Sequence, residues 1–268
     1  MTASEGAKVA IVTGASSGIG AASATLLAKR GFDVGITFRA NEAGAEDVVA
    51  GVQRLGRRAA ATQLDLARPE EAEAAIESLA DRLGRLDVLV NNAGLNRRAE
   101  ALEETLEGWS TILAIDLVGP WACARAAAER MIAAGEGGRI VNVSSVLAFS
   151  PIDGGGAYCA AKAGLEMLTK VLALEWARHG IAVNAVAPGH TATPMNYDPE
   201  ELDDTVIERP VIPLGRAAAP EEVAEAIAYL ASADSSYLTG ASLLVDGGLL
   251  LQSGPQSFQI ATEPQPRA

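Results

Sequence analysis

Histidine and cysteine are scarce in this chain of 268 residues. It has two histidines, His179 and His190, and two cysteines, Cys123 and Cys159. Two histidines cannot build a histidine metal cluster or an HExxH site, so we predict no metal centre and place His179 at a helix end and His190 in a loop. Two distant cysteines without a CxxC pattern also exclude a disulfide framework. Reduced, buried thiols are the expectation, and they suit a cytoplasmic protein.

Basic residues are also few. Lysine and arginine number 21 against 34 acidic residues, which gives a formal net charge of -13. Such a charge repels phosphate backbones and anionic membrane surfaces, so neither nucleic acid nor membrane is expected as a partner.

Long uninterrupted apolar runs are lacking as well. The longest run without a charged residue, Val9 to Ala28, is broken by three glycines, three serines and two threonines, which argues against a membrane span. A secretory signal is not indicated either, because Glu5 stands where a basic region is expected and the apolar block ends at Val12.

The pattern that fills the chain is an alternation of short Val/Ile-rich runs with Ala-rich helical segments. Hydrophobic residues make up 49% of the chain, enough to bury a large core. The alternation predicts an α/β fold with a single Rossmann-type, doubly wound parallel sheet of about seven strands flanked by helices. Without a Pro/Ser-rich linker, residues 1–250 are expected to form one domain. The expected strands are 9–13, 34–38, 59–64, 88–91, 140–143, 181–185 and 242–245, and helices are expected to begin near residues 17, 43, 69, 106, 157 and 220.

Two segments interrupt this alternation. Residues 189–216 contain four prolines and many acidic residues, and they follow the carboxyl end of a predicted strand. They indicate either a substrate lid or a solvated acidic loop. Residues 251–268 are polar and contain prolines, which predicts a C-terminal tail or a subunit contact.

A glycine-rich stretch, "VAIVTGASSGIGAASATLLAKRG", joins the first predicted strand to the first predicted helix. Gly14, Gly18 and Gly20 lie at the turn, where backbone amides and a helix N-terminus can hold a pyrophosphate. The spacing differs from the usual GxGxxG, and a tight turn would also require glycine. On this stretch alone both interpretations stay open.

A second unusual stretch begins at residue 158. Leucines recur at spacings of three and four, which predicts a packed helix, yet Tyr158 and Lys162 are also four apart and share one face. An ammonium beside a phenol favours the phenolate and so lowers the tyrosine pKa from about 10. Ser145 follows the predicted strand "RIVNVSS", at the sheet edge where α/β proteins bind ligands.

Taken in order, these motifs closely resemble the short-chain dehydrogenase/reductase family. They are "TGASSGIG" at 13–20, "NNAG" at 91–94, Ser145, Tyr158 with Lys162, "PG" at 188–189 and "VDGG" at 245–248. The resemblance covers residues 8 to about 250. It implies an enzyme that transfers a hydride between a nicotinamide cofactor and a carbonyl or alcohol.

The resemblance also implies roles for the catalytic residues. Ser145 would bind the substrate oxygen, Tyr158 would act as general acid in reduction and as general base in oxidation, and Lys162 would perturb Tyr158 and bind the nicotinamide ribose. Asp116 occupies a fourth position at which the family usually has asparagine. If that position works through its main-chain carbonyl, which we favour, aspartate can replace asparagine. If the side-chain amide is needed, activity will be reduced.

Cofactor contacts follow from the same resemblance, which places the two residues 65–66 beside the adenine. The second strand ends with Phe38, where an acidic residue would bind the ribose of NAD, and Arg39 follows. A guanidinium suits the extra phosphate of NADP, so NADP(H) preference is predicted, with a merely solvated arginine as the alternative. The full set of implied cofactor residues is Gly14, Ser16, Ser17, Gly18, Ile19, Gly20, Arg39, Asp65, Leu66, Asn92, Ala93, Gly94, Tyr158, Lys162, Pro188, Gly189, Thr191 and Thr193.

The substrate is expected to be a small ketone or secondary alcohol. The chain resembles bacterial members grouped with 3-oxoacyl-(acyl carrier protein) reductases, sugar dehydrogenases and diacetyl reductases. For an acyl-carrier partner, docking residues would be Arg97, Arg98, Arg125 and Arg130, which ordinary solvation explains equally well. Apolar pocket walls are expected from Leu95, Leu147, Phe149, Met195, Tyr197 and Val206.

Other interpretations remain beside the reductase. A catalytically weak NADP-binding regulator is one, because Asp116 replaces the usual asparagine. A sugar-nucleotide epimerase is another, although only residues 189–216 could supply its substrate domain. The resemblance further implies a homotetramer, or a homodimer, formed through helices near 105–134 and 157–179 and the final strand.

Overall fold

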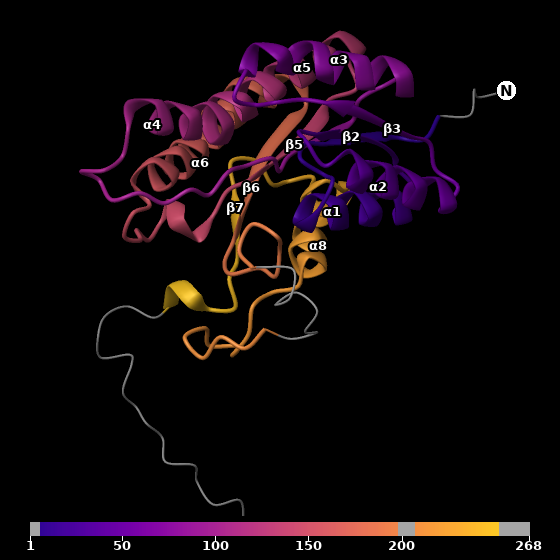
Figure 1. The fold of residues 1–268 in the computed structure, drawn as a ribbon. Coiled ribbons are helices and arrows are strands. Elements are labelled where there is room, and N and C mark those ends of the chain that lie inside the picture. Colours follow the sequence, from indigo (N-terminus) through magenta and orange to yellow (C-terminus); the bar gives the residue numbers. More distant parts are fainter. Residues whose placement is uncertain (1–5, 198–206, 252–268) are drawn as a thin grey trace, which may run out of the picture.

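A seven-stranded parallel sheet forms the centre of the molecule in the computed structural model, which describes residues 6–197 and 207–251 (Figure 1). The strand order is β3-β2-β1-β4-β5-β6-β7. The strands are β1 (Val9–Val12), β2 (Asp33–Phe38), β3 (Ala59–Gln63), β4 (Val88–Asn91), β5 (Gly138–Val143), β6 (Ile181–Pro188) and β7 (Ser242–Val245). The predicted fold class is confirmed, and each expected strand lies within a few residues of its observed position.

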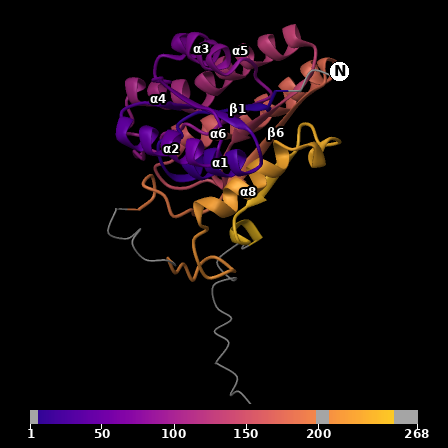
Figure 2. The ribbon, with the colours of Figure 1, turned by 90° about the vertical axis from the view of Figure 1, so that its right-hand side faces the viewer.

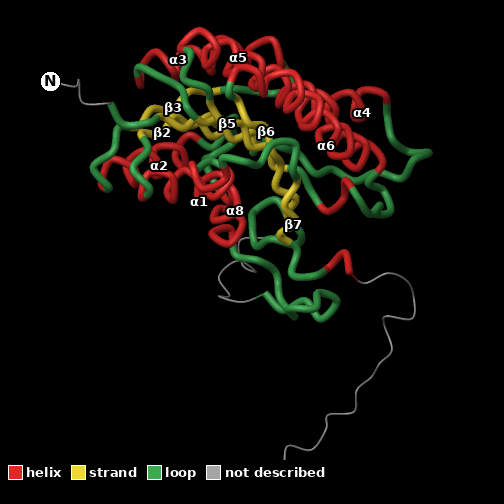
Figure 3. The backbone as a smooth tube through the Cα atoms, turned by 180° about the vertical axis from the view of Figure 1, so that it is seen from behind, coloured by secondary structure: helices red, strands yellow, loops and turns green. Residues whose placement is uncertain are grey.

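Helices cover both faces of the sheet (Figures 1 and 3). One layer contains α1 (Gly18–Lys29), α2 (Glu42–Arg54) and α8 (Pro220–Leu230). The other contains α3 (Ala72–Leu83), α4 (Leu106–Leu113), α5 (Gly119–Ala134) and α6 (Gly156–Trp176). Seen after a quarter turn, α8 lies beside α1, on the layer opposite α3 and α5 (Figure 2). This three-layer arrangement explains why the central strands are mostly apolar, since helices cover both of their faces.

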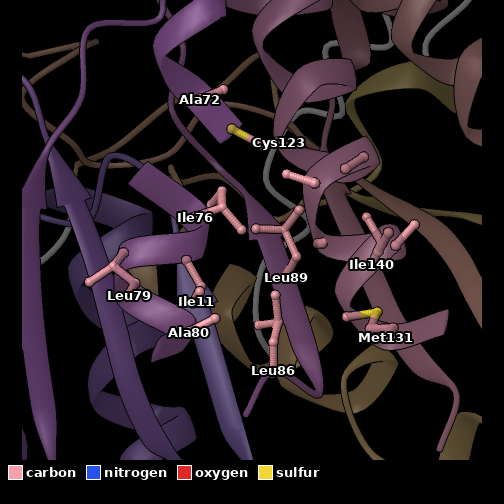
Figure 4. Packing of buried hydrophobic residues seen from close by; sticks show 14 of the residues in the cluster. Ile11, Ala72, Ile76, Leu79, Ala80, Leu86, Leu89, Cys123, Met131 and Ile140 are labelled. Carbon is pink, nitrogen blue, oxygen red and sulfur yellow. The ribbon is translucent and has the colours of Figure 1, made fainter. Parts of the chain in front are cut away.

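The core between the sheet and the α3/α5 layer is tightly filled (Figure 4). Ile11, Leu89 and Ile140 project from β1, β4 and β5 and are fully buried, as are Leu79 of α3 and Met131 of α5. Burying an aliphatic side chain of this size contributes roughly 1.5–3 kcal/mol. The core therefore fixes the strands whose carboxyl ends form the site.

Residues 106–134 form one continuous apolar rod. By length and composition it could span a membrane, but 56% of its most apolar window is buried inside the fold, as in a core helix. Between α4 and α5 it widens into a π-helical turn, Ala114–Val118. Such turns often mark functional positions, and this one brings Asp116 into the interior.

The scarce residues lie much as expected. Cys123 is buried, and burial raises the pKa of its thiol to about 12, whereas Cys159 is only half-buried. His179 ends the short helix after α6, followed by Gly180 in the left-handed region. Of the predicted lid, residues 198–206 lie outside the described residues, as do residues 252–268 of the predicted tail.

Candidate active site

A cavity of about 1070 Å³ opens at the carboxyl ends of the strands. It lies where the chain order reverses, between β1 and β4, which is the usual ligand site of a doubly wound sheet. All the predicted catalytic and cofactor residues line it except Gly20 and Asp116. Those two lie directly behind its wall, so the structure brings the whole predicted set together.

The glycine-rich loop forms one end of the cavity. Gly14 and Gly18 have φ angles of 63° and 55°, in the left-handed region that favours glycine. A Cβ on Gly14 would lie 2.8 Å from the Cα of Ala93. Within the described chain no side chain caps the N-terminus of α1, and its first turn holds no acidic residue. Its first amides are therefore free to donate hydrogen bonds to an anionic group, which fits the pyrophosphate of a dinucleotide.

Asn92 braces this loop from β4. Its Nδ2 donates to the carbonyl oxygens of Thr13 at 2.9 Å and Gly14 at 3.0 Å, while Thr13 Oγ1 accepts from the backbone amides of Asn92 and Ala93. A Cβ on Gly20 would lie 2.5 Å from Asn92 Nδ2. Asn92 does line the cavity, but its amide group is engaged with the protein, a role that the motif alone did not indicate.

The end of β2 forms a second part of the cavity wall. Phe38 is buried at the end of the strand, and the exposed Arg39 follows it. Residues 6–197 and 207–251 offer Arg39 no ion pair, and only its carbonyl oxygen is engaged, by Gln63 Nε2 at 2.8 Å. Asn41 caps α2 through Gly44 and donates to Ser16 O at 3.3 Å, which ties this turn to the glycine-rich loop.

Ser145, Tyr158 and Lys162 meet at the opposite end of the cavity. Ser145 follows β5 and accepts a hydrogen bond from the amide of Leu147 at 3.1 Å. Tyr158 and Lys162 lie on the first turns of α6, with Lys162 Nζ 5.5 Å from the centroid of the tyrosine ring. The ammonium also donates to Val143 O at 3.1 Å, which fixes it against the end of β5.

The side chain of Asp116 contacts this group directly. Its Oδ1 lies 3.1 Å from Lys162 Nζ, and both carboxylate oxygens accept from the amide of Leu95. Asp116 is fully buried and Lys162 is 3% exposed. A Cβ on Gly94 would lie 2.7 Å from Asp116 Oδ1, so the carboxylate occupies the space that glycine leaves open. The sequence-based expectation that Asp116 acts through its main-chain carbonyl did not include this ion pair of its side chain.

The pKa of Tyr158 is raised rather than lowered. Burial raises it, the charge of Lys162 lowers it, the charge of Asp116 raises it, and Ser145 lowers it. The prediction that Lys162 lowers the pKa of Tyr158 overall is therefore wrong, because burial and the charge of Asp116 outweigh the effect of the ammonium. Burial alone would lower the pKa of Lys162, but Asp116 reverses this and raises it. Burial also raises the pKa of Asp116 against the opposing effect of Lys162.

The remaining wall is mostly as predicted. Tyr197 is buried but does not line the cavity, and Val206 lies outside the described residues. Four of the expected apolar residues do line it: Leu95, Leu147, Phe149 and Met195.

Sequence reasoning missed several lining residues, chiefly Asn96, Arg98, His190, Val211 and Leu250. They lie beyond the strand ends, in loops and, for Leu250, in a short 3-10 helix, where no spacing signals a role. Burial lowers the pKa of His190, as do the charges of Arg209 and Arg98. No group of three or more His, Cys, Asp or Glu residues is placed to hold a metal in the part of the chain that the structure describes.

Comparison with protein families and curated proteins gives extensive matches. A family model described as "Enoyl-(Acyl carrier protein) reductase" matches residues 14–250. The chain is 46% identical to the uncharacterized oxidoreductase YohF of Escherichia coli, over 93% of this chain and 98% of that protein. It is 40% identical to a 3-oxoacyl-[acyl-carrier-protein] reductase of Synechocystis, over 91% and 98%.

Solved structures agree with the fold. Acetoin dehydrogenase YohF from Salmonella typhimurium matches with a TM-score of 0.88 and 47% identity, over 93% of this chain and 98% of that chain. Carveol dehydrogenase from Mycobacterium avium, solved in complex with NAD, matches with a TM-score of 0.83 and 29% identity, over 92% and 99%. The chain belongs to the short-chain dehydrogenase/reductase family of oxidoreductases, which bind a nicotinamide cofactor.

Proposed function

We propose that the protein is an NADP(H)-preferring carbonyl reductase or alcohol dehydrogenase that acts on a small ketone or secondary alcohol. The observation that carries this proposal is the meeting of Ser145, Tyr158 and Lys162 in one cavity with the glycine-rich loop. The loop offers free amides for the pyrophosphate at one end, and the three side chains offer a proton relay at the other.

Each of the three side chains has a distinct task. Ser145 Oγ orients the substrate oxygen, and the Tyr158 hydroxyl gives its proton to that oxygen in reduction or accepts it in oxidation. Lys162 stabilises the phenolate that reduction leaves behind until solvent returns the proton. The bound nicotinamide supplies or accepts the hydride at the carbonyl carbon. In reduction the π bond of the carbonyl and the O–H bond of Tyr158 break, the C–O single bond remains, and the product gains one C–H bond and one O–H bond.

NADP(H) preference rests on the end of β2. Phe38 provides no carboxylate to bind a ribose hydroxyl, and Arg39 lies exposed at the cavity wall without an ion pair in the described residues. A planar guanidinium matches the geometry of a phosphate monoester. Arg39 would therefore hold the phosphate that distinguishes NADP from NAD.

A small ketone is proposed as the substrate because of the residues of the cavity wall and because of a similar solved structure. Leu95, Leu147 and Phe149 give the wall near Ser145 an apolar character. The Salmonella structure is titled an acetoin dehydrogenase, which suggests diacetyl and acetoin as the first compounds to test.

A 3-oxoacyl-(acyl carrier protein) reductase is the second candidate, favoured by the Synechocystis relative. Such an enzyme needs free basic residues for its acidic carrier protein. Three of the four arginines considered are paired with carboxylates: Arg97 with Glu104, Arg125 with Glu73 at 2.7 Å and Arg130 with Asp81 at 2.5 Å. These ion pairs place this candidate second.

A cytoplasmic homotetramer, or a homodimer, completes the proposal. Large apolar side chains are exposed along α4–α6 and on β7, where close packing against another copy would cover them. These side chains are Leu106, Trp109, Trp121, Met167, Val171, Leu174 and Leu244.

The test is the consumption of NADPH, with NADH in parallel, on diacetyl, acetoin, small ketones, keto-sugars and an acetoacetyl thioester. Tyr158→Phe is the matched blank, since it removes only the hydroxyl. We expect NADPH-dependent turnover of a small ketone that Tyr158→Phe reduces by at least about a hundredfold, while NADPH still binds. Tight NADPH binding without turnover of any carbonyl would instead support the cofactor-binding regulator. Turnover that survives Tyr158→Phe would refute the proposed proton relay.

A further inference from the structure

The ion pair between Asp116 and Lys162 changes the charge of the proton relay. Lys162 Nζ has Val143 O and Asp116 Oδ1 as partners, each at 3.1 Å, and it stands 5.5 Å from the ring centroid of Tyr158. Solvent screens little of this charge, because the exposed fractions are 3% for Lys162, 7% for Tyr158 and 0% for Asp116. The three groups thus form one buried electrostatic unit.

The charges in this unit already cancel while Tyr158 is protonated. One ammonium and one carboxylate sum to zero, so ionisation of the phenol would leave a net negative charge in a buried place. A buried net charge carries a large desolvation penalty. With an uncharged residue in place of Asp116, the same unit would become neutral only when the phenol or the ammonium lost a proton.

The other groups that face the unit do not offset this effect. Glu166, one turn further along α6, is also buried, accepts from Ser242 Oγ at 3.0 Å, and adds a second negative charge near Lys162. Cys159, beside Tyr158 on α6, would also oppose the phenolate if it ionised. From the end of β5, the Ser145 hydroxyl favours the phenolate but carries no charge. Across the cavity, His190 lines the wall, and burial and its arginine neighbours lower its pKa, so it titrates at a lower pH than the phenol.

We propose that Asp116 is a positioning residue that neutralises Lys162 and thereby holds Tyr158 as the proton donor. This inference rests on the proposed reductase function and adds to it which of the two reactions, carbonyl reduction or alcohol oxidation, the site favours. Carbonyl reduction needs the phenol and alcohol oxidation needs the phenolate. Through Lys162 and Tyr158, Asp116 therefore raises both the pH up to which carbonyl reduction proceeds and the pH at which alcohol oxidation begins.

The first test uses the protein without turnover. Ionisation of Tyr158 is followed by ultraviolet difference spectroscopy of the phenolate, as the difference between the wild type and Tyr158→Phe, because the chain has four tyrosines. In the wild type we expect the midpoint of Tyr158 ionisation to lie above that of a free tyrosine, which is about pH 10. In Asp116→Asn, which keeps the shape and removes the charge, ionisation should begin at lower pH.

Glu166→Gln is the matched control. It removes one buried carboxylate and changes the net charge equally, but Glu166 makes no hydrogen bond to Lys162 in the described chain. Its effect on Tyr158 should be clearly smaller. A wild-type Tyr158 midpoint below that of a free tyrosine would overturn the proposal, as would a midpoint in Asp116→Asn that is unchanged or higher than in the wild type. If circular dichroism shows Asp116→Asn unfolded, the wild-type titration alone decides.

The second test uses the enzyme in both directions. In Asp116→Asn the pH at which alcohol oxidation begins and the pH at which carbonyl reduction declines should fall together. Oxidation at about pH 8 should become faster by on the order of tenfold, the change that one pH unit represents. The proposal would be contradicted if the pH at which oxidation begins and the pH at which reduction declines shifted in opposite directions. If no carbonyl or alcohol is turned over, the proposed function fails, whereas the phenolate titration still tests the role of Asp116.

Discussion

The exposed guanidinium at the end of β2 allows a direct test of cofactor preference by Arg39→Ala. Arg39 lines the cavity and has no carboxylate partner in the described residues, so its removal frees no buried charge and breaks no ion pair of the fold. Its carbonyl oxygen, which accepts from Gln63, is unchanged by the substitution. The effect should therefore be confined to the ligand.

The magnitude follows from the exposure of Arg39. A hydrogen bond to a charged group contributes about 1.5–3 kcal/mol, and solvent screening at an exposed site reduces this to about 1–2 kcal/mol. Since 1.4 kcal/mol is a factor of ten, NADPH should bind about 5- to 30-fold more weakly to Arg39→Ala. NADH lacks the extra phosphate, so its affinity should stay within about twofold by the same conversion.

Isothermal titration calorimetry with both cofactors measures this difference. Arg178→Ala, at an exposed position outside the cavity, is the control for the loss of one positive charge. The wild-type preference should also narrow as salt is raised, because the contact is exposed. Equal wild-type affinity for NADH and NADPH would refute the reasoning. So would an Arg39→Ala variant that loses both cofactors equally.

Two further predictions concern stability and assembly. Hydrogen bonds from Arg216 at 2.7 and 2.8 Å and from the amide of Ala219 hold the pKa of Glu222 at about 2, below its ordinary 4.5. This stabilisation is complete above about pH 4.5 and is lost as the pH falls through about 2. Glu222→Gln should therefore lower the Tm at pH 7. The difference in Tm from the wild type should vanish as the pH falls from about 4.5 to about 2. A Tm difference that is the same at every pH would contradict this prediction. Light scattering should give the mass of two or four chains of 27.5 kDa, and a single-chain mass would reject the oligomer.

The sheet was predictable because its signals are local. Runs such as Val9–Val12 are short and apolar throughout, and helical spacing follows them, so the alternation indicates a parallel sheet. Element ends were less well predicted. β6 continues to Pro188, since its last residues pair with Val245 of β7, and a pairing partner more than fifty residues away leaves no mark in the local pattern.

The residues of the candidate site could be predicted from the sequence, but the pKa of Tyr158 within it could not. The ordered motifs placed Ser145, Tyr158 and Lys162 together, and the cavity lining agrees. The net rise in the pKa of Tyr158 depends on burial and on Asp116, which lies buried in a π-helical turn and contacts Lys162 there. Neither burial nor that turn can be read from the spacing of residues.

The residues that loops contribute to the cavity wall could not be predicted from the sequence either. His190 and Val211 reach the cavity because the segments after β6 fold back over it, with His190 O accepting from the amide of Ala218. Such long-range contacts depend on loop conformation. Sequence patterns that repeat every two or four residues carry no information about it.

The hydrogen bonds made by Asn92 separate two properties of the proposed cofactor site: the shape of the glycine-rich loop and the choice between NAD and NADP. The shape of the glycine-rich loop is held by β4, through the bonds from Asn92 to Thr13 and Gly14. Discrimination between the two cofactors is proposed to lie instead at the end of β2, at Arg39. A loop already held in shape has little ordering entropy to lose on binding. Nicotinamide specificity should therefore be exchangeable at the end of β2 without redesign of the loop, provided that Asn92 and Gly20 are left untouched.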